Sequence, residues 1–580
     1  MKQIKKGARI AALLLAISML APLALPAANA TYAPPYTALR IGLFFETTEL
    51  PSANLQNADG SGSGFEFGYF NNRNEFVSTG AWTDETRISM MMDRNMNWVP
   101  GAGGGAGEYQ EGTSGSVVVG CYHVQINSGY DTFEDASAEA QRYQDAFVRY
   151  QAGRFLVLVG QYASRSGAEG AQSSLDIRGS AINSGTQNTV TVAKTGTNTI
   201  LFEFDMGENG YLGVMPRRTG DGNPETLFRN NRYNGGFQYA RRGGMLLTVV
   251  NYVEIEDYVK GILPYEMSNS WPLEALKAQA LCARTYAMSS LNKHNSSGFD
   301  LCTTEHCQVY RGRDRTNATT DRAVEETAGM YVTYDGELTQ TFYAASNGGA
   351  SESSENVWAQ PLPYLRGVID TYEASIAANI PNYYWTITYT PAEITQRLRS
   401  RGYECATIVS MVVSQFSPTG NVVAVTMTDS NGRRFVFSRR AQLITALGIS
   451  TQHFTIGNQS WEQVSFFAND PAENMGSGPQ FFVVDDSGST VAIPGNAMYA
   501  ITGEDSIVAV ESEIGTGEGG DTNLINGVFT IRGSGRGHSV GMSQWGAYAM
   551  ASNYNMSYID IIQFYFSGVE ITQTLPNEET

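Results

Sequence analysis

Apolar residues repeat at helical spacing in two parts of the chain. In residues 273–291 the apolar stripe is mostly alanine, so a neighbouring backbone can approach closely, and Pro272 stands at the start, where its missing N–H costs nothing. In residues 133–149 an aromatic or alanine side chain recurs every three or four positions. Both segments are predicted to be helices.

Short apolar runs between polar loops predict strands. The clearest of these runs are 37–45, 116–120, 122–126, 155–160, 189–192, 199–204, 245–250, 384–389, 422–427 and 481–484. Further helices are expected after residue 161 and over 543–552. The mixture predicts an α+β fold. A Gly-rich run at 101–107 is interpreted as a linker, and the acidic, Gly-rich stretch 503–520 is expected to be mobile.

The first 30 residues have the pattern of a secretory signal. The segment holds four basic and no acidic residues, an apolar stretch from Ile10 to Leu20, and a small-x-small cleavage site at Ala28-Asn29-Ala30. An uncleaved anchor is the alternative, but the apolar run is too short to span a bilayer without including two prolines. We therefore expect an exported protein that is not held in a membrane after cleavage.

The composition narrows the class of partner. The chain has 580 residues with 38 Lys+Arg and 57 Asp+Glu, which gives a net charge of −19. Nucleic acid and an anionic membrane surface are unlikely partners on this ground, because both require a basic footprint. The length favours about two to four domains. Five cysteines leave at least one thiol unpaired in an oxidising exterior.

The segment after residue 114 has a distinct predicted order of secondary structure. Strand, helix, strand and helix are predicted in that order, with Val124-Gln125-Ile126 and 157–162 as the characteristic runs. This order resembles the SPOR domain, a small module that binds peptidoglycan glycan strands without stem peptides. An ordinary insertion without a ligand is the alternative. The pattern and the linker before it predict a self-contained unit that can be deleted without loss of the rest.

Three blocks carry the most specific information. Residues 257–286 begin Asp-Tyr-Val-Lys-Gly-Ile-Leu-Pro-Tyr-Glu-Met, residues 342–365 begin Phe-Tyr-Ala-Ala-Ser-Asn-Gly-Gly-Ala, and residues 535–547 read Gly-Arg-Gly-His-Ser-Val-Gly-Met-Ser-Gln-Trp-Gly-Ala. Together they resemble the stage II sporulation protein D / LytB (SpoIID) family. The resemblance implies a mixed catalytic domain with two insertions, and it predicts these divisions: a signal peptide (1–30), an N-terminal part (31–113), the SPOR-like insert (114–185), the catalytic core (186–370), a β-rich insertion (371–526) and a C-terminal part of the core (527–580).

The resemblance implies one of two functions. Some family members are lytic transglycosylases that cleave peptide-stripped peptidoglycan glycan strands, and others enhance a cell-wall amidase. The catalytic glutamate of the family corresponds to Glu266. Tyr265, Met267 and Trp271 are expected to raise its pKa, and a nearby helix start to oppose them. Glu274 is the nearest candidate for a second carboxylate, but its place in the first turn of a helix favours a dipole-compensating role.

Five further residues are predicted to contact the glycan: Arg284, Tyr286, Ser346, His538 and Gln544. The Ser-Asn-Gly-Gly turn at Ser346 and the Gly-rich turn at His538 let a substrate approach the backbone. Alternatives remain for several of them. Arg284 can form an ion pair with Glu254, Glu256 or Asp257, the turn at Ser346 can be a plain hairpin connection, and His538 can be a buried packing residue.

A metal site is predicted at Cys302, His306 and Cys307. Two thiolates and one imidazole within six residues can reach one tetrahedral zinc, and a similar Cys/His cluster holds zinc in some members of the family. A Cys302–Cys307 disulfide is the alternative that an oxidising exterior favours. The zinc is expected to be structural, and no organic cofactor is indicated.

The combined interpretation is an exported, cell-wall-associated lytic transglycosylase with Glu266 as general acid and base. Its expected partner is the peptidoglycan glycan strand. A non-catalytic wall-binding protein that enhances an N-acetylmuramoyl-L-alanine amidase is the alternative, in which case the amidase is a second partner.

Overall fold

The computed structural model describes residues 38–573, apart from 103–105, 127–128, 176–179, 221–222, 243, 359 and most of 458–522. The predicted signal segment and most of the acidic stretch 503–520 lie outside the described residues. Within them, sheets and helices mix along the chain, which confirms the α+β class. No helix among the described residues is long and apolar enough to cross a membrane.

A seven-stranded sheet contains the strand that leads into the first of the three sequence blocks. Its strands, in sheet order, are β20 (Leu301–Cys302), β1 (Leu39–Phe44), β19 (Leu247–Val253), β18 (Gly236–Arg241), β15 (Leu212–Pro216), β3 (Phe65–Phe70) and β4 (Phe76–Thr83). Strand β1 confirms the predicted run at 37–45, and β19 confirms the run at 245–250. Every residue of β19 is buried, as expected for a strand in the middle of a sheet that is covered on both faces.

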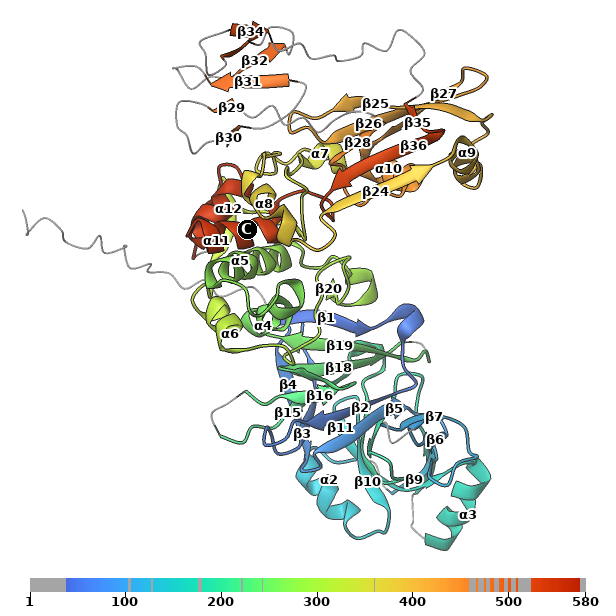
Figure 1. Cartoon of the computed structure of the whole chain (residues 1–580). Coiled ribbons are helices and arrows are strands. Elements are labelled where there is room, and N and C mark those ends of the chain that lie inside the picture. Colours follow the sequence, from blue (N-terminus) through green and yellow to red (C-terminus); the bar gives the residue numbers. More distant parts are fainter. Residues whose placement is uncertain are drawn as a thin grey trace, which may run out of the picture.

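A ten-stranded sheet packs below the first one (Figure 1). In sheet order its strands are β12 (Ala181–Ser184), β9 (Tyr122–Gln125), β11 (Arg154–Tyr162), β10 (Ala146–Gln151), β14 (Ile200–Asp205), β13 (Val190–Lys194), β5 (Arg87–Met92), β2 (Ser52–Asn57), β16 (Thr226–Phe228) and β17 (Asn231–Tyr233). The predicted strands at 122–126, 155–160, 189–192 and 199–204 are all present.

The helix predicted over 133–149 is wrong in its second half. Helix α2 (Phe133–Ala140) ends early, and the residues that follow form β10, which pairs with β11. The run Ala-Phe-Val-Arg-Tyr of β10 is rich in aromatic and β-branched residues, so strand pairing overrides its helical spacing. Helix α3 (Arg165–Leu175) is the second helix expected after residue 161.

The segment 114–185 is also not self-contained. Strand β10 pairs in parallel with β14, which lies beyond the predicted boundary, so one sheet runs through both parts. Buried residues of the segment, including Val148 and Phe155, belong to the same hydrophobic core as Phe202 and Phe204 of β14. Deletion of the segment would therefore expose the edge of β14 and part of the shared core, and we expect it to destabilise the rest of the sheet.

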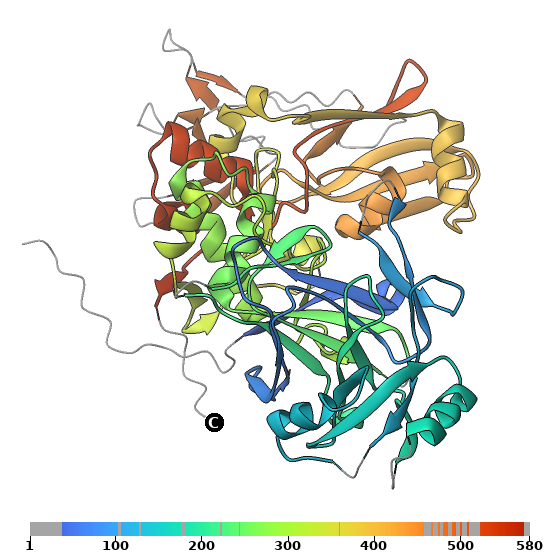
Figure 2. The same ribbon diagram turned by 90° about the horizontal axis from the view of Figure 1, so that it is seen from below.

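Helices from the middle and the C-terminal part of the chain form the layer that contains the first and third sequence blocks. They are α4 (Ile255–Glu266), α5 (Leu273–Ser289), α6 (Ala318–Glu325), α8 (Thr371–Ser375), α11 (Gln544–Asn553) and α12 (Tyr558–Tyr565). Figures 1 and 2 show green α5 beside red α11 and α12. Gln279 of α5 and Gln544 of α11 are 265 residues apart in the sequence and are hydrogen-bonded to each other. The predicted helices 273–291 and 543–552 are confirmed.

The β-rich insertion has a hydrophobic core of its own. It contains a sheet of β25 (Ile408–Phe416), β26 (Val422–Asp429) and β27 (Arg434–Ser438), and the helices α9 (Pro391–Arg399) and α10 (Arg439–Leu447). Its strands β24 (Tyr384–Tyr389) and β28 (Phe454–Ile456) pair with β36 (Val528–Ser534), which lies beyond the predicted boundary at residue 526. The strand at 480–484 confirms the last predicted run. Because β36 is the central strand and leads into the third block, the insertion is joined directly to the functional layer.

Candidate functional site

Glu266 is the last residue of α4, a helix that the sequence analysis did not predict. Gly261 and Pro264 weaken helical propensity there, but the buried face that includes Tyr258 and Ile262 stabilises the helix through packing. Gly261 has a specific use. A Cβ at this position would lie 2.4 Å from the ring of Tyr310, so glycine lets the segment after Cys307 approach the helix.

That close approach supplies the first hydrogen bond to the carboxyl group. The backbone N–H of Val309 donates to Glu266 Oε1 at 2.9 Å. The carboxyl group is half-buried, and burial raises its pKa, while hydrogen bonds from Val309, Tyr343 and Gln544 act in the opposite direction. The end of α4 is a C-terminal end, whose partial negative charge also disfavours a carboxylate. The helix start expected near Glu266 is that of α5, seven residues further on.

Two side chains reach Glu266 from strands that are far apart in the sequence. Tyr343 lies on β23 (Tyr343–Ala344), and Gln544 follows β37 (Met542–Ser543), which pairs with β23 in parallel. Gln544 Nε2 also donates to Gln279 Oε1 of α5 at 3.3 Å. Gln308 Nε2 donates to the Tyr343 hydroxyl at 3.1 Å. The predicted residues Glu266 and Gln544 are thus brought together, whereas Tyr343 was not singled out, although it lies in the second block.

Three predicted glycan contacts are already engaged elsewhere. The Arg284 guanidinium is fully buried and forms hydrogen bonds of 2.7–3.2 Å with both carboxylate oxygens of Glu256. The Tyr286 hydroxyl accepts from Lys293 Nζ at 3.0 Å and is nearly inaccessible. The Ser346 hydroxyl is buried and donates to Glu373 Oε1 at 2.5 Å. The structure therefore favours the ion-pair alternative for Arg284, and we do not propose these three as glycan contacts.

His538 is half-buried in an aromatic group. Its ring lies 5.2 Å from the ring of exposed Trp358 and 6.4 Å from that of Phe342. Burial lowers its pKa to about 4, and Nδ1 accepts from the N–H of Val540 at 3.1 Å. His538 is therefore a neutral imidazole at neutral pH and not a proton donor of the site.

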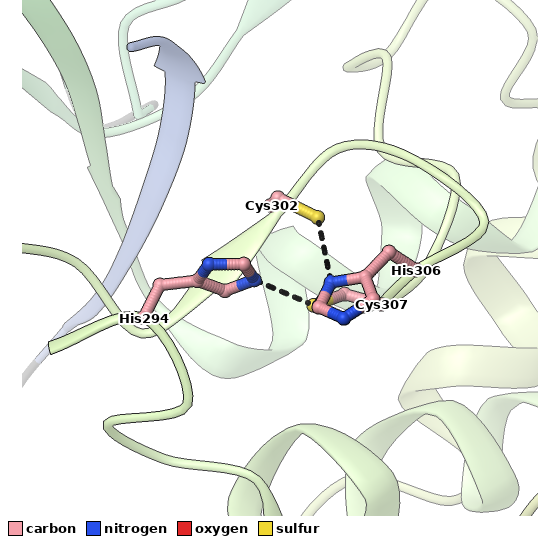
Figure 3. A group of neighbouring side chains, drawn as sticks. All are labelled: His294, Cys302, His306 and Cys307. Carbon is pink, nitrogen blue, oxygen red and sulfur yellow. Dashed lines mark hydrogen bonds between the residues drawn. The ribbon is translucent and has the colours of Figure 1, made fainter. Parts of the chain in front are cut away.

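Two cysteines and two histidines converge in one cluster (Figure 3). The ligand atoms of Cys302, His306, Cys307 and a fourth residue, His294, all lie within 4.8 Å of one another. Cys302 Sγ lies 3.8 Å and Cys307 Sγ 3.9 Å from His306 Nδ1, and Cys307 Sγ lies 3.4 Å from His294 Nε2. His294 was missed because it precedes Cys302 by eight residues, on the loop that follows α5.

The four donors fit a tetrahedral zinc. Zinc bonds of about 2.3 Å to sulfur and about 2.0 Å to nitrogen place such ligands roughly 3.5 Å apart. Both thiols are free, so the structure holds no Cys302–Cys307 disulfide. The hydrogen bond between the two thiols lowers the pKa of Cys302 and raises that of Cys307, so it favours a thiolate at Cys302 alone. Lys293 Nζ donates to the backbone carbonyl of His306 at 2.7 Å and ties the loop to Tyr286.

Comparison with known proteins places this site in a family. The model of the Stage II sporulation protein family (SpoIID) matches residues 244–334, which contain Glu266 and all four members of the Cys/His cluster. An uncharacterized protein of Brachyspira hyodysenteriae is 31% identical over 328 residues, which cover 56% of this chain and 68% of that protein.

The chain belongs to the SpoIID family. Its similarity extends to the amidase enhancer of Bacillus subtilis, 29% identical over 332 residues that cover 54% of this chain and 40% of that protein. Stage II sporulation protein D of Bacillus amyloliquefaciens is 23% identical over 339 residues, which cover 56% of this chain and 76% of that protein. SpoIID membership and these relatives support a cell-wall-related function.

Proposed function

We propose that this protein is an exported lytic transglycosylase that cleaves peptide-stripped peptidoglycan glycan strands, with Glu266 as general acid and base. The observation that carries the proposal is the state of Glu266. Its carboxyl group is half-buried, has a raised pKa, and is bound by the neutral donors Val309, Tyr343 and Gln544. A carboxyl group with a raised pKa is better suited to protonate a leaving group than an ordinary glutamate.

The reaction needs one such group. Glu266 donates its proton to the glycosidic oxygen as the bond to the anomeric carbon breaks. The resulting carboxylate then accepts the proton of the sugar's own primary hydroxyl, whose oxygen closes on the anomeric carbon. The cycle restores the acid and consumes no water. Val309 N–H fixes one oxygen of Glu266 throughout. His538 remains a proposed glycan contact, whereas buried Gln544 acts on Glu266 and Gln279.

A hydrolase would require a second carboxylate at a defined distance. Glu274 does not supply it, because its carboxylate accepts from Lys277 Nζ at 2.8 Å and from the N–H of Tyr558 at 2.9 Å. Glu305, exposed on the zinc-site loop, is a negative charge close enough to contribute to the raised pKa of Glu266. Product chemistry separates the two reactions, because only hydrolysis leaves reducing ends.

The Cys/His cluster is proposed to hold one structural zinc through His294, Cys302, His306 and Cys307. The same loop delivers Val309 to Glu266 two residues after Cys307. Bound zinc would fix this loop, and with four protein ligands it would have no open position for water. We also propose secretion to the cell wall, on the signal pattern of residues 1–30.

The second candidate function is enhancement of a cell-wall amidase, which the similarity to the amidase enhancer of Bacillus subtilis favours. The test is an assay of the purified protein alone on peptide-stripped glycan, and with an added amidase on intact peptidoglycan. A transglycosylase releases soluble glycan fragments without the amidase. An enhancer releases nothing alone and increases the rate of the amidase.

A further inference from the structure

Glu373 is a buried carboxylate on the short helix α8, outside the set of residues that contact Glu266. Four neutral donors converge on it. Oε1 accepts from the Ser346 hydroxyl at 2.5 Å and from the N–H of Gly348 at 3.0 Å. Oε2 accepts from the N–H of Asn347 at 3.0 Å and from the Ser543 hydroxyl. One carboxylate therefore joins the second sequence block to the third.

The joined segments are those that deliver the side chains around Glu266. Strands β23 and β37 pair with Ala344 opposite Ser543. Ser346 follows β23 by two residues, and Ser543 immediately precedes Gln544. Glu373 thus holds both strands close to these side chains, through Ser346 three residues after Tyr343 and through Ser543 one residue before Gln544.

Ser543 also begins the helix that carries Gln544. Its Oγ accepts from the N–H of Gly546 at 3.1 Å, which caps α11, while its hydroxyl proton is donated to Glu373. The cap is therefore oriented by the carboxylate. Asp370, beside Glu373, supports the same corner, because it accepts from Asn347 Nδ2 at 2.8 Å and from the Tyr565 hydroxyl at 2.5 Å.

We infer that Glu373 is a positioning residue of the glycan-cleaving site, whose carboxylate fixes β23 and β37 so that Tyr343 and Gln544 meet Glu266. The inference rests on the proposed function for its catalytic consequence, and on the hydrogen bonds above for its geometry. It explains why the buried Ser-Asn-Gly-Gly turn, predicted to offer N–H donors to substrate, points two of them at Glu373.

Glutamine is the informative substitution because it nearly preserves the shape. Each carboxylate oxygen accepts from one backbone N–H and one hydroxyl. In either orientation the amide NH₂ of Glu373→Gln faces the N–H of Asn347 or Gly348, and two donors cannot bond to each other. The Ser-Asn-Gly-Gly turn must then move. Ser543, which is bound to the same carboxylate, and the adjacent Gln544 move with it.

The test is a mutant cycle in which kcat for glycan cleavage is measured. Glu373→Gln is expected to lower kcat by about 10-fold to 100-fold with little change in KM, the size of loss that follows a small misplacement. In a Tyr343→Phe/Gln544→Ala background the same substitution is expected to have little further effect. An equal loss of kcat in both backgrounds would overturn the inference. Partial recovery in Glu373→Asp, which keeps both acceptor oxygens, is expected as well.

Glu352→Gln is the matched control. Glu352 is also a buried glutamate bound by neutral donors, the N–H of Ser353 and the amide of Asn356, and these contact neither Tyr343 nor Gln544. Its kcat should stay near the wild-type value even where its melting temperature falls. If wild-type protein cleaves no glycan, the proposed function fails, and crystal structures then decide the inference. A displaced Gln544 side chain in Glu373→Gln supports it, and an unmoved Gln544–Gln279 hydrogen bond overturns it.

Discussion

Glu203 in the ten-stranded sheet and Glu266 at the end of α4 are both withdrawn from water, but only Glu203 has cations beside it. Arg149 Nη2 lies 2.5 Å and His123 Nε2 3.4 Å from its carboxylate. Burial alone would raise the pKa of Glu203, but Arg149 and His123 lower it to about 2. The bonding partners of Glu266 are neutral, and its pKa is raised.

The difference separates a structural acid from a reactive one. A buried carboxylate that is paired with arginine stays ionised and holds strands together, whereas the raised pKa of Glu266 suits transfer of a proton to a leaving group. Asp93, His123 and Glu203 are of metal-binding type and lie close together. Arg149 already supplies positive charge to them, so this cluster is a charge network of the sheet and not a second metal site.

The largest expected effect is the loss of glycan cleavage on substitution of Glu266. Glu266→Gln removes the transferable proton and should lower the rate of glycan cleavage by about 10²-fold to 10⁴-fold. The melting temperature should stay the same or rise, because a neutral amide avoids the cost of a buried charge. Rate assays and thermal unfolding check the two expectations. Glu274→Gln is the control, and an equal loss of rate in that variant would remove Glu266 from its proposed role.

The opposite pattern is expected for Arg149→Leu. The substitution leaves Glu203 and Asp93 buried without their main cation and should cost about 3–5 kcal/mol of unfolding free energy. Cleavage per folded molecule should be unchanged, since Arg149 lies in the β region. Denaturant unfolding measures the loss. A stable Arg149→Leu variant would show that buried Glu203 and Asp93 do not depend on Arg149.

Metal content sharpens the comparison between the two clusters. Elemental analysis of protein purified without added metal should find one zinc per chain, and a chelator should lower the melting temperature more than the initial rate. Cys302→Ser should lose the zinc, and Asp93→Asn should keep it. Two zinc ions per chain would contradict the assignment of the Arg149 cluster, and no zinc with a Cys302–Cys307 crosslink would show that the disulfide alternative is right.

An effect of pH on stability is expected from Asp93. Burial and the neighbouring Glu203 raise its pKa to about 7 from a usual value of 3.8, so the folded protein holds this proton more tightly than the unfolded chain. The resulting stability is present below about pH 4 and is lost as pH rises to about 7, by at most about 1.4 kcal/mol per pH unit. Asp93→Asn should flatten the profile of stability against pH in this window. An unchanged slope would show that Asp93 is ionised throughout.

The sequence predicted much of this arrangement, where a local pattern and the final contacts agree. The alanine stripe of 273–291 and the apolar strand runs are of this kind. The segment 146–151 was misassigned because Phe147 continues the helical spacing of the residues before it, whereas pairing with β11 and β14 makes the segment a strand. Helix α4 was missed because Gly261 and Pro264 oppose it locally, and only packing against Tyr310 explains the glycine.

Only part of the candidate site could be predicted from the sequence. Glu266 and Gln544 follow from the resemblance of the blocks to the SpoIID family. The contacts of Arg284 with Glu256 and of Ser346 with Glu373 depend on which buried group lies opposite, which composition and spacing do not encode. His294 joins the cysteine cluster only because the loop after α5 folds back on itself.

The most direct test of the account is mass analysis of the products that the purified protein releases from peptide-stripped glycan strands. The account predicts fragments that end in an anhydro sugar, with no water added, and their loss in Glu266→Gln. Fragments with reducing ends would contradict the transglycosylase mechanism and indicate a hydrolase. Uncleaved strands, together with a faster amidase on intact peptidoglycan, would show that the protein is an enhancer.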